Sequence, residues 1–430
     1  MNQPNKPNKM KKSFFLSLML LLTLSAWGKP TGTYSYVVEG FDWGAGVNKV
    51  ILHLADTTSK AMASEYQVFA SRKSAAGPIS DLQNTRDIVT AYVSDEQGNR
   101  VKTGKYITLV LAVSPTSPIT SPIQYLRGKG NVWVDYAMTV MHTKSQQIWD
   151  TPERKIMPLV DQFDLTGKYT YNEKLTMSYA SYAPKTTKEK SPLVIWLHGG
   201  GEGGTDPTIP LLGNKAANYA SEGIQAIFDG AYVLSPQCPG AWMHNEKGVG
   251  TQGKDNDIYN EGLMALIKDY VKANPKIDAN RIYVGGCSNG GYMALKLILL
   301  YPDYFAAGYI SALAYRSEYI ADADIQKIKQ VPMWFVHSKD DMTTIPKLTV
   351  EPVFDRLRAA GAKNVHFTYY DHVNDITNFY GGKGFQYNGH WSWVYLHENL
   401  PRTDLDGSAV RVNGKPVTIM EWLAAQKKGK

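Results

Sequence analysis

Apolar and polar residues alternate along the first third of the chain with the two-residue period of β-strands. Alternating or β-branched runs occupy residues 50–54, 88–92, 106–113 and 132–141. The proline-rich stretch 114–122 and the glycines around 128–130 separate them as loops. Roughly five or more strands at this spacing predict an all-β sandwich of immunoglobulin type over residues 31–142. A linker containing Pro152 and Pro158 is expected to follow.

After about residue 160, buried strands alternate with helices. Strands are indicated at 193–197, 231–235, 281–285, 305–310, 333–336 and 365–370. Helices are indicated at 214–228, 263–271 and 291–301, and another has Pro352 in its first turn and Gly361 just past its end. This alternation predicts an α/β domain over residues 160–430, with a parallel sheet covered by helices on both faces. Near the carboxyl end, Asn413-Gly414 predicts a hairpin, and Thr418 with Glu421 predicts a capping box.

Composition and charge narrow the class of protein. Of 430 residues, 43% are hydrophobic and 20% are charged, which is ordinary for a globular protein. The formal net charge is +7, but residues 1–28 hold four lysines and no acid, so the remainder has 42 basic and 39 acidic residues, or +3. That balance argues against nucleic acid as a partner. Two cysteines are too few for a disulfide scaffold or a zinc cluster. The nine histidines show no paired spacing typical of metal ligands, so we expect neither a metal nor an organic cofactor.

The amino terminus has the pattern of a secretory signal. Lys11 and Lys12 precede an apolar run over residues 13–24, and small residues follow at Ala26 and Gly28. We expect cleavage after Gly28, which makes residues 1–28 a signal peptide and the mature protein secreted or periplasmic. The apolar run is short for a bilayer span and no second one follows it, so no stable membrane anchor is expected.

A candidate nucleophile stands between a strand and a helix. The strand at 281–285 continues into Gly286-Cys287-Ser288-Asn289-Gly290 and then directly into the next helix. A nucleophilic serine needs such a sharp turn, with glycines on both sides so that no Cβ clashes. Cys287 is one position out of register for a cysteine nucleophile. A Cys238–Cys287 disulfide is an alternative that an oxidising compartment would allow.

A glycine-rich turn after an earlier strand could bind an oxyanion. His198-Gly199-Gly200-Gly201 follows the strand 193–197, and its backbone amides, together with that of Asn289, are candidates for this role. With Gly204, the same glycines also satisfy the spacing of a dinucleotide-binding loop. That alternative is disfavoured, because prolines follow instead of an immediate helix and no acidic residue ends the next strand.

Candidate acid and base residues follow Ser288 along the chain. Asp340 and Asp341 come after the strand 333–336, and only one of them can face a histidine. His390 is the favoured general base, with His372 and His397 as rivals.

Taken together, these stretches resemble an α/β-hydrolase. Residues from roughly 160 to 400 are similar to secreted esterases related to polyhydroxybutyrate depolymerases and feruloyl esterases, which are often labelled predicted peptidases. Residues 31–142 resemble the immunoglobulin-like amino-terminal domain that some of these esterases carry. The resemblance implies Ser288 as nucleophile and His390 as base. It favours Asp341 as the acid, because Asp341 lies four residues after His337. It implies Gly200 and Asn289 as oxyanion donors, with Gly201 as a substitute for Gly200, although Ser338 stands where the family usually has glycine.

The expected function is hydrolysis of carboxylic esters by a secreted serine esterase that forms an acyl-enzyme. Only about twenty residues separate the strand 305–310 from the next one, so no large lid is expected over the cleft. Trp242 and Trp391 are expected to bind substrate by stacking on sugar or phenolic rings, which suits acyl groups on a plant polysaccharide or another polymeric ester. Two alternatives stay open: a serine peptidase of the same fold, and a non-catalytic carbohydrate-binding protein.

Overall fold

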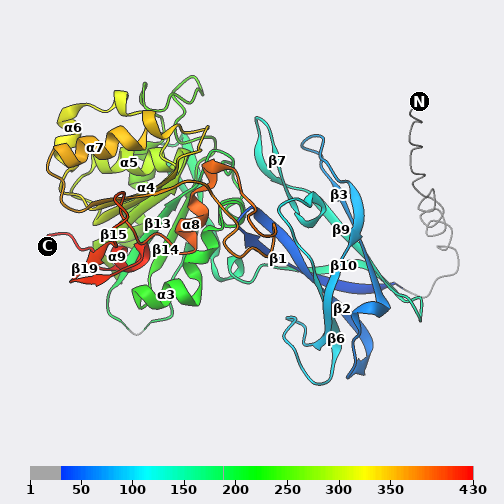
Figure 1. The fold of residues 1–430 in the computed structure, drawn as a ribbon. Coiled ribbons are helices and arrows are strands. Elements are labelled where there is room, and N and C mark those ends of the chain that lie inside the picture. The colour runs from blue at the N-terminus through cyan, green and yellow to red at the C-terminus, as the bar shows by residue number, and fades with distance from the viewer. Residues whose placement is uncertain (1–30, 187, 430) are drawn as a thin grey trace, which may run out of the picture.

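The amino-terminal part of the protein is a large, mostly antiparallel sheet that folds back on itself (Figure 1). A computed structural model describes residues 31–186 and 188–429. The sheet has the strand order β4-β3-β9-β10-β1-β2-β6-β5. Its strands are β1 (Gly32–Phe41), β2 (Gly44–Thr58), β3 (Tyr66–Lys73), β4 (Gln83–Arg86), β5 (Ile88–Ser94), β6 (Gly104–Leu111), β9 (Asp135–His142) and β10 (Ile148–Ile156). A separate hairpin consists of β7 (Ile123–Leu126) and β8 (Gly130–Trp133).

The two ends of this sheet meet. Strands β4 and β5 stand at opposite ends of the hydrogen-bonded order, yet only Asp87 separates them along the chain. Arg86 at the end of β4 donates hydrogen bonds to the carbonyl oxygens of Val47 and Ala112, both at 2.8 Å. Folding over in this way buries one apolar face of the sheet against itself, as in an immunoglobulin-like sandwich.

The expectation that a linker begins after residue 142 is wrong. Strand β10 continues the amino-terminal sheet to Ile156, and Pro152 lies opposite Tyr34 in its parallel pairing with β1. Its pairing with β9 stops at Trp149, so the following residues have one neighbouring strand and are largely exposed. An exposed, polar strand lacks the alternation by which strands are recognised in a sequence.

The carboxyl-terminal part is a mostly parallel sheet with helices on both faces, as expected (Figure 1). Its strands, in the order β11-β12-β14-β13-β15-β16-β17-β18, are β11 (Asp164–Tyr171), β12 (Leu175–Tyr182), β13 (Ser191–Leu197), β14 (Tyr232–Gln237), β15 (Ile277–Cys287), β16 (Ala307–Ser311), β17 (Met333–Ser338) and β18 (Val365–Tyr370). One apolar core lies under α4 (Asn260–Ala273), α5 (Asn289–Leu300), α6 (Asp322–Ile328) and α7 (Val350–Ala359). The opposite core includes residues of α2 (Thr208–Gly213), α3 (Glu222–Phe228), α8 (Trp393–His397) and α9 (Ile419–Ala424), and it continues into the amino-terminal sheet.

Local signals in the sequence agree with most of these boundaries. Gly361 past α7 has φ +89°, and the capping box of Thr418 and Glu421 opens α9. The small hairpin of β19 (Arg411–Val412) and β20 (Lys415–Pro416) turns at Asn413-Gly414. The antiparallel pair β11–β12 was not predicted. The helix expected over 214–228 is instead a 3₁₀ helix, Ala216–Ala220, followed by α3, because Ser221 between them has an extended backbone.

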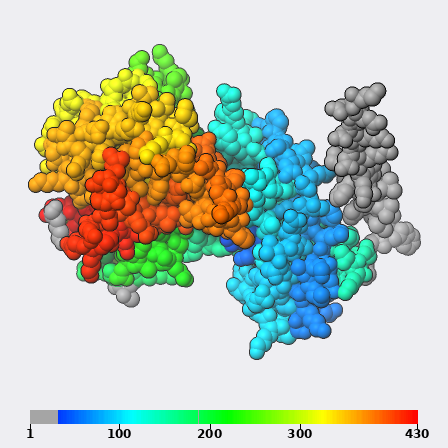
Figure 2. Space-filling model, viewed as in Figure 1, coloured from blue at the N-terminus to red at the C-terminus, as the bar shows by residue number. Residues whose placement is uncertain are grey.

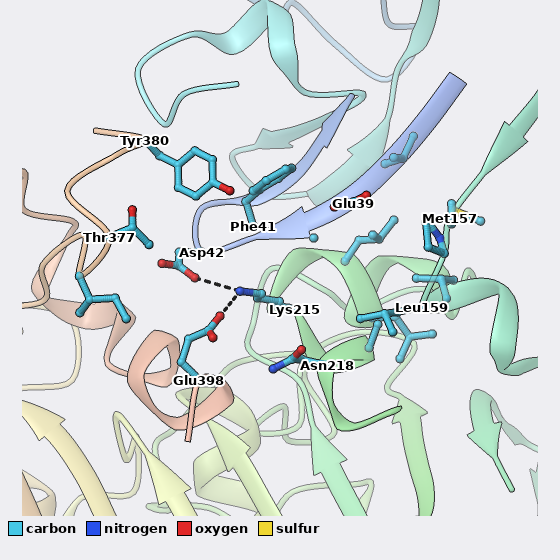
Figure 3. A pocket seen from close by; sticks show the side chains of 18 residues that line it. Glu39, Phe41, Asp42, Met157, Leu159, Lys215, Asn218, Thr377, Tyr380 and Glu398 are labelled. Carbon is cyan, nitrogen blue, oxygen red and sulfur yellow. Dashed lines mark hydrogen bonds and ion pairs between the residues drawn. The ribbon is translucent and has the colours of Figure 1, made fainter. Parts of the chain in front are cut away.

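Polar and aromatic contacts join the two parts. Lys215, just after α2, lies between Asp42 of the β1–β2 turn and Glu398 after α8, as Figure 3 shows, with a Lys215–Asp42 distance of 3.3 Å. A cavity of about 430 Å³ adjoins this cluster.

Tyr380 contacts Phe41 and Trp43 edge-on, with ring centroids 5.4 and 5.1 Å away. In Figure 2 the orange surface near residue 380 accordingly meets the blue surface of the amino-terminal part.

The expected signal peptide, residues 1–28, lies outside the described residues. Within the described part of the chain, no helix is both long and apolar enough to cross a membrane.

Candidate active site

Ser288 occupies a strained turn between β15 and α5. Its backbone has φ 54° and ψ −115°, a conformation that costs a non-glycine residue about 1–3 kcal/mol. The turn is possible because two glycines let the chain pass very close to β13: a Cβ on Gly290 would meet the carbonyl of Leu197, and a Cβ on Gly286 would meet Gly290. The serine hydroxyl therefore stands at the carboxyl edge of the sheet, at the start of α5.

Three segments far apart in the chain form one hydrogen-bonded series at this edge. Ser288 Oγ lies 2.9 Å from His390 Nε2, and His390 Nδ1 lies 2.8 Å from Asp341 Oδ2. Because the carboxylate accepts the Nδ1–H, the Nε2 lone pair is left to accept the serine proton. The structure thus brings together the serine, acid and histidine that the sequence singled out.

Asp341 is buried and surrounded by donors. It is 1% exposed, and the amides of Thr343 and Thr344 donate to its Oδ1 at 2.8 and 2.9 Å. Its Oδ2 accepts from the Thr344 hydroxyl at 2.7 Å and from His337 Nε2 at 3.0 Å, besides His390. Burial raises the pKa of Asp341, but the hydrogen bonds from His337 and His390 outweigh it and hold that pKa well below its usual range. The acid is therefore ionised at neutral pH.

The rival acid and bases are occupied elsewhere. Asp340 accepts hydrogen bonds from Ser338 and from His372 Nδ1, the latter at 2.9 Å, whereas His390 Nδ1 is hydrogen-bonded to Asp341. His397 is buried against Trp196, and burial lowers its pKa to about 3. Neither His372 nor His397 reaches the serine, so the alternatives left open by the sequence are resolved by geometry.

The glycine turn after β13 lies beside the start of α5. A Cβ on Gly200 would be 3.8 Å from the Cβ of Asn289, so the two proposed oxyanion donors are neighbours. His198, which sequence reasoning did not single out, braces this turn. Its Nε2 accepts from the Cys238 amide at 3.0 Å, which leaves its Nδ1–H to donate to the Gly199 carbonyl at 2.6 Å. Burial lowers the pKa of His198 to about 4, so the ring is neutral at physiological pH.

A cleft of about 640 Å³ surrounds Ser288 and His390. The carboxyl-terminal part contributes Trp391 and Trp393, and the amino-terminal part contributes Trp43, Tyr125 and Asn131, among others. The sequence did not predict that both parts would line the cleft, since no local pattern shows where a distant domain docks. Trp391 lines the same cleft as Ser288 and His390.

The prediction that Trp242 binds substrate is wrong. Trp242 is 0% exposed and packs against His198 and Tyr259, with ring centroids 5.2 and 6.2 Å away. Its loop follows β14 beneath the glycine turn, so its ring fills the core under the site. Cys238 and Cys287, for which a disulfide was the alternative, are both buried and are not bonded to each other in this structure. The described residues contain no group of His, Cys, Asp and Glu side chains arranged to hold a metal ion.

The sheet order, the strained serine turn and the position of the site at the carboxyl ends of the strands define an α/β-hydrolase. Residues 33–152 match the family described as the esterase Ig-like N-terminal domain, and residues 182–375 match the family described as phospholipase/carboxylesterase. The chain thus joins an immunoglobulin-like domain to an α/β-hydrolase domain.

Individual relatives agree with this assignment. The chain is 32% identical over 129 residues to feruloyl esterase B of Neurospora crassa, which covers 30% of this chain and 41% of that protein. It is 29% identical to poly(3-hydroxyalkanoate) depolymerase C of Paucimonas lemoignei over 29% of this chain and 28% of that protein. The chain therefore spans less than half the length of either relative. A solved structure described as a thermostable esterase shares the fold over 92% of this chain and 99% of its own, with a TM-score of 0.71 and 22% identity.

Proposed function

We propose that this protein is an exported serine esterase that hydrolyses carboxylic esters through an acyl-enzyme on Ser288. The observation that carries the proposal is the continuous series Ser288–His390–Asp341, with separations of 2.9 and 2.8 Å, at a strained strand-to-helix turn. Export rests on the signal pattern of residues 1–28.

The geometry supports a role for each residue in the proposed acylation. Ser288 Oγ attacks the ester carbonyl carbon while its proton moves to His390 Nε2. The ionised Asp341 stabilises the resulting imidazolium through its bond to Nδ1. The negative charge on the carbonyl oxygen is stabilised by the amides of Gly200 and Asn289 and by the amino terminus of α5.

Collapse and deacylation reuse the same groups. The carbon–oxygen bond to the leaving alcohol breaks, and His390 returns the proton to that oxygen. Water then enters the cleft, gives a proton to His390 and attacks the acyl carbon. The bond between the acyl carbon and Ser288 Oγ breaks, His390 returns the proton to that oxygen, and the carboxylic acid leaves.

The substrate class follows from the cleft and from the relatives. A cleft with Trp43, Tyr125, Trp391 and Trp393 among its walls suits an ester with an aromatic or sugar ring. The named relatives act, by their names, on feruloyl esters and on poly(3-hydroxyalkanoate). We therefore propose an ester of a polymer, foremost acyl groups on a plant polysaccharide.

The test measures release of p-nitrophenol from acetate and butyrate esters. Wild type is expected to turn over, and Ser288→Ala is expected to lose about 10⁶-fold in kcat, to the assay background. Ser59→Ala, at an exposed serine of the amino-terminal part, is the matched control and should behave as wild type. A fluorophosphonate probe should label Ser288 alone, as read by mass spectrometry.

Two results would contradict the proposal. Ester hydrolysis that survives Ser288→Ala would remove the nucleophile, and the absence of both turnover and labelling would indicate a binding protein. A parallel panel of peptide p-nitroanilides separates the peptidase alternative, which predicts anilide cleavage without a preference for esters.

A further inference from the structure

A hairpin of the amino-terminal domain touches the glycine turn of the active site directly. Strand β7, which pairs with β8 in this hairpin, lies on the side of the amino-terminal part next to the hydrolase domain (Figure 1). In β8, the amide of Asn131 donates to the Gly201 carbonyl at 2.6 Å. The side-chain Nδ2 of the same residue donates to Glu202 Oε1 at 2.7 Å. One residue of the first domain therefore holds two consecutive residues of the turn beside the proposed oxyanion donors.

The β7–β8 hairpin and the glycine turn are closely packed against each other. Gly130 has φ +84°, and a Cβ there would meet the carbonyl of Gly201. A Cβ on Gly201 would lie 3.2 Å from Cε2 of Tyr125 on the other strand of the hairpin. The backbone of the turn is thus confined on the side facing the amino-terminal domain, so a shift of the hairpin moves the turn with it.

Glu202 links this contact to the rest of the turn. It is 5% exposed, and besides Asn131 its carboxylate is hydrogen-bonded by Asn214. Asn214 Oδ1 also accepts a hydrogen bond from the Gly199 amide at 3.2 Å. Gln237 Nε2 donates a hydrogen bond to the backbone carbonyl of Glu202 at 3.0 Å. Gly199 and Glu202 bracket the amides of Gly200 and Gly201. Fixing both ends therefore sets the direction in which those amides point.

The hairpin is itself anchored on both sides. Arg72 of β3, 1% exposed, donates to Gln124 of β7 at 2.9 Å. Trp133 at the end of β8 donates from Nε1 to Thr208 Oγ1 of the hydrolase domain at 3.0 Å. These contacts place Asn131 rigidly against the turn, with the amino-terminal sheet behind it.

We infer that Asn131 is a positioning residue for the esterase reaction: through Gly201 and Glu202 it holds the glycine turn in the conformation that presents its amides to the oxyanion. The inference rests on the proposed function and assigns to the immunoglobulin-like domain a direct part in transition-state stabilisation. Asn131 acts through the turn and does not itself touch the reacting atoms.

The experiment reverses the polarity of the Asn131–Glu202 hydrogen bond. Asn131→Asp replaces the donor with a carboxylate that faces Glu202, whose pKa burial raises to about 7, so at pH 8.5 the two groups repel. Among the described residues, the buried thiol of Cys287 also lies close enough to Glu202 for their charges to interact. In the double variant Asn131→Asp/Glu202→Gln, the new amide at position 202 can donate to the new carboxylate at position 131. Arg127→Ala, in the exposed turn of the same hairpin, is the matched control.

Kinetics on p-nitrophenyl butyrate at pH 8.5 give the decisive readout. We expect Asn131→Asp to lower kcat about tenfold to hundredfold with little change in KM, because misdirected amides weaken binding of the transition state and not of the ester. The double variant should regain most of that loss, and Arg127→Ala should match wild type. Binding of an alkyl boronic acid, which forms a tetrahedral adduct on the serine, should weaken in parallel with kcat.

Two outcomes would overturn the inference. One is an Asn131→Asp variant with the kcat of Arg127→Ala. The other is a loss that Asn131→Asp/Glu202→Gln does not restore, which would mean that the first change damages the fold. In either case a wild type whose ester turnover depends on Ser288 leaves the proposed function standing. A wild type without such turnover removes the proposed function itself.

Discussion

The Asp341→Asn change tests the reasoning about the active site most directly, because the structure predicts what each atom of the new side chain meets. The asparagine carbonyl can take the place of Oδ1 and keep the amides of Thr343 and Thr344. Its NH₂ group then takes the place of Oδ2, where it faces the donors that Oδ2 now accepts from, including Nε2–H of His337 and Nδ1–H of His390. Donor meets donor at this position.

The magnitude follows from the tautomer of His390. To accept from the new NH₂ group, His390 must move its proton to Nε2, and that nitrogen then cannot take the proton of Ser288. An aspartate-to-asparagine change in such a triad lowers kcat about 10⁴-fold, equivalent to about 5 kcal/mol of activation free energy. His337 Nε2–H can still donate to the Thr344 carbonyl at 3.0 Å, but the buried NH₂ group meets a donor there instead of an acceptor, which should cost about 1–3 kcal/mol of unfolding free energy.

The adjacent aspartate provides the control. Asp340→Asn changes a carboxylate that is hydrogen-bonded by Ser338 and His372, while His390 is bonded to Asp341, so its kcat should stay within a few-fold of wild type. Both variants are assayed with p-nitrophenyl acetate, and urea unfolding is measured alongside. The reasoning is refuted if Asp340→Asn loses as much activity as Asp341→Asn, or if Asp341→Asn keeps more than about a tenth of the wild-type kcat.

Two further predictions concern stability. Burial raises the pKa of Glu202 from 4.5 to about 7, and the hydrogen bond from Asn131 offsets only part of this rise. The folded state therefore binds the proton more tightly than the unfolded state, so the unfolding free energy falls as pH rises from 4.5 to about 7. Gln at position 202 does not titrate, so the unfolding free energy of Glu202→Gln, measured with urea, should rise by about 3 kcal/mol relative to that of wild type between pH 4 and pH 8.5. A difference between the two proteins that does not change with pH would contradict this. Gly290→Ala should lower the unfolding free energy by at least about 2 kcal/mol, because the new Cβ meets the carbonyl of Leu197. Gly223→Ala in α3 has open space around its Cβ and should raise the unfolding free energy by up to about 1 kcal/mol. Equal effects of the two changes in the same assay would refute the steric argument.

Features that depend on neighbouring residues could be predicted from the sequence. The serine turn is one, since Gly286 and Gly290 lie within two positions of Ser288 and the strand and helix on either side have clear apolar patterns. The capping box of α9 and the hairpin at Asn413-Gly414 are others. Strand β10 was missed because it is polar and exposed, so its sheet partner and not its own pattern makes it a strand.

By itself, the sequence determined the α/β alternation, the position of the proposed nucleophile Ser288 and the small set of residues from which an acid and a base could be drawn. Only the tertiary structure decided that Asp341 and not Asp340 meets His390, and that Trp242 is buried while Trp391 lines the cleft. It alone brought Asn131 to the glycine turn. The physical reason is the same in each case: a turn or a cap is stabilised by contacts within a few residues, whereas these outcomes depend on contacts between segments separated by tens to hundreds of positions, which no local pattern records.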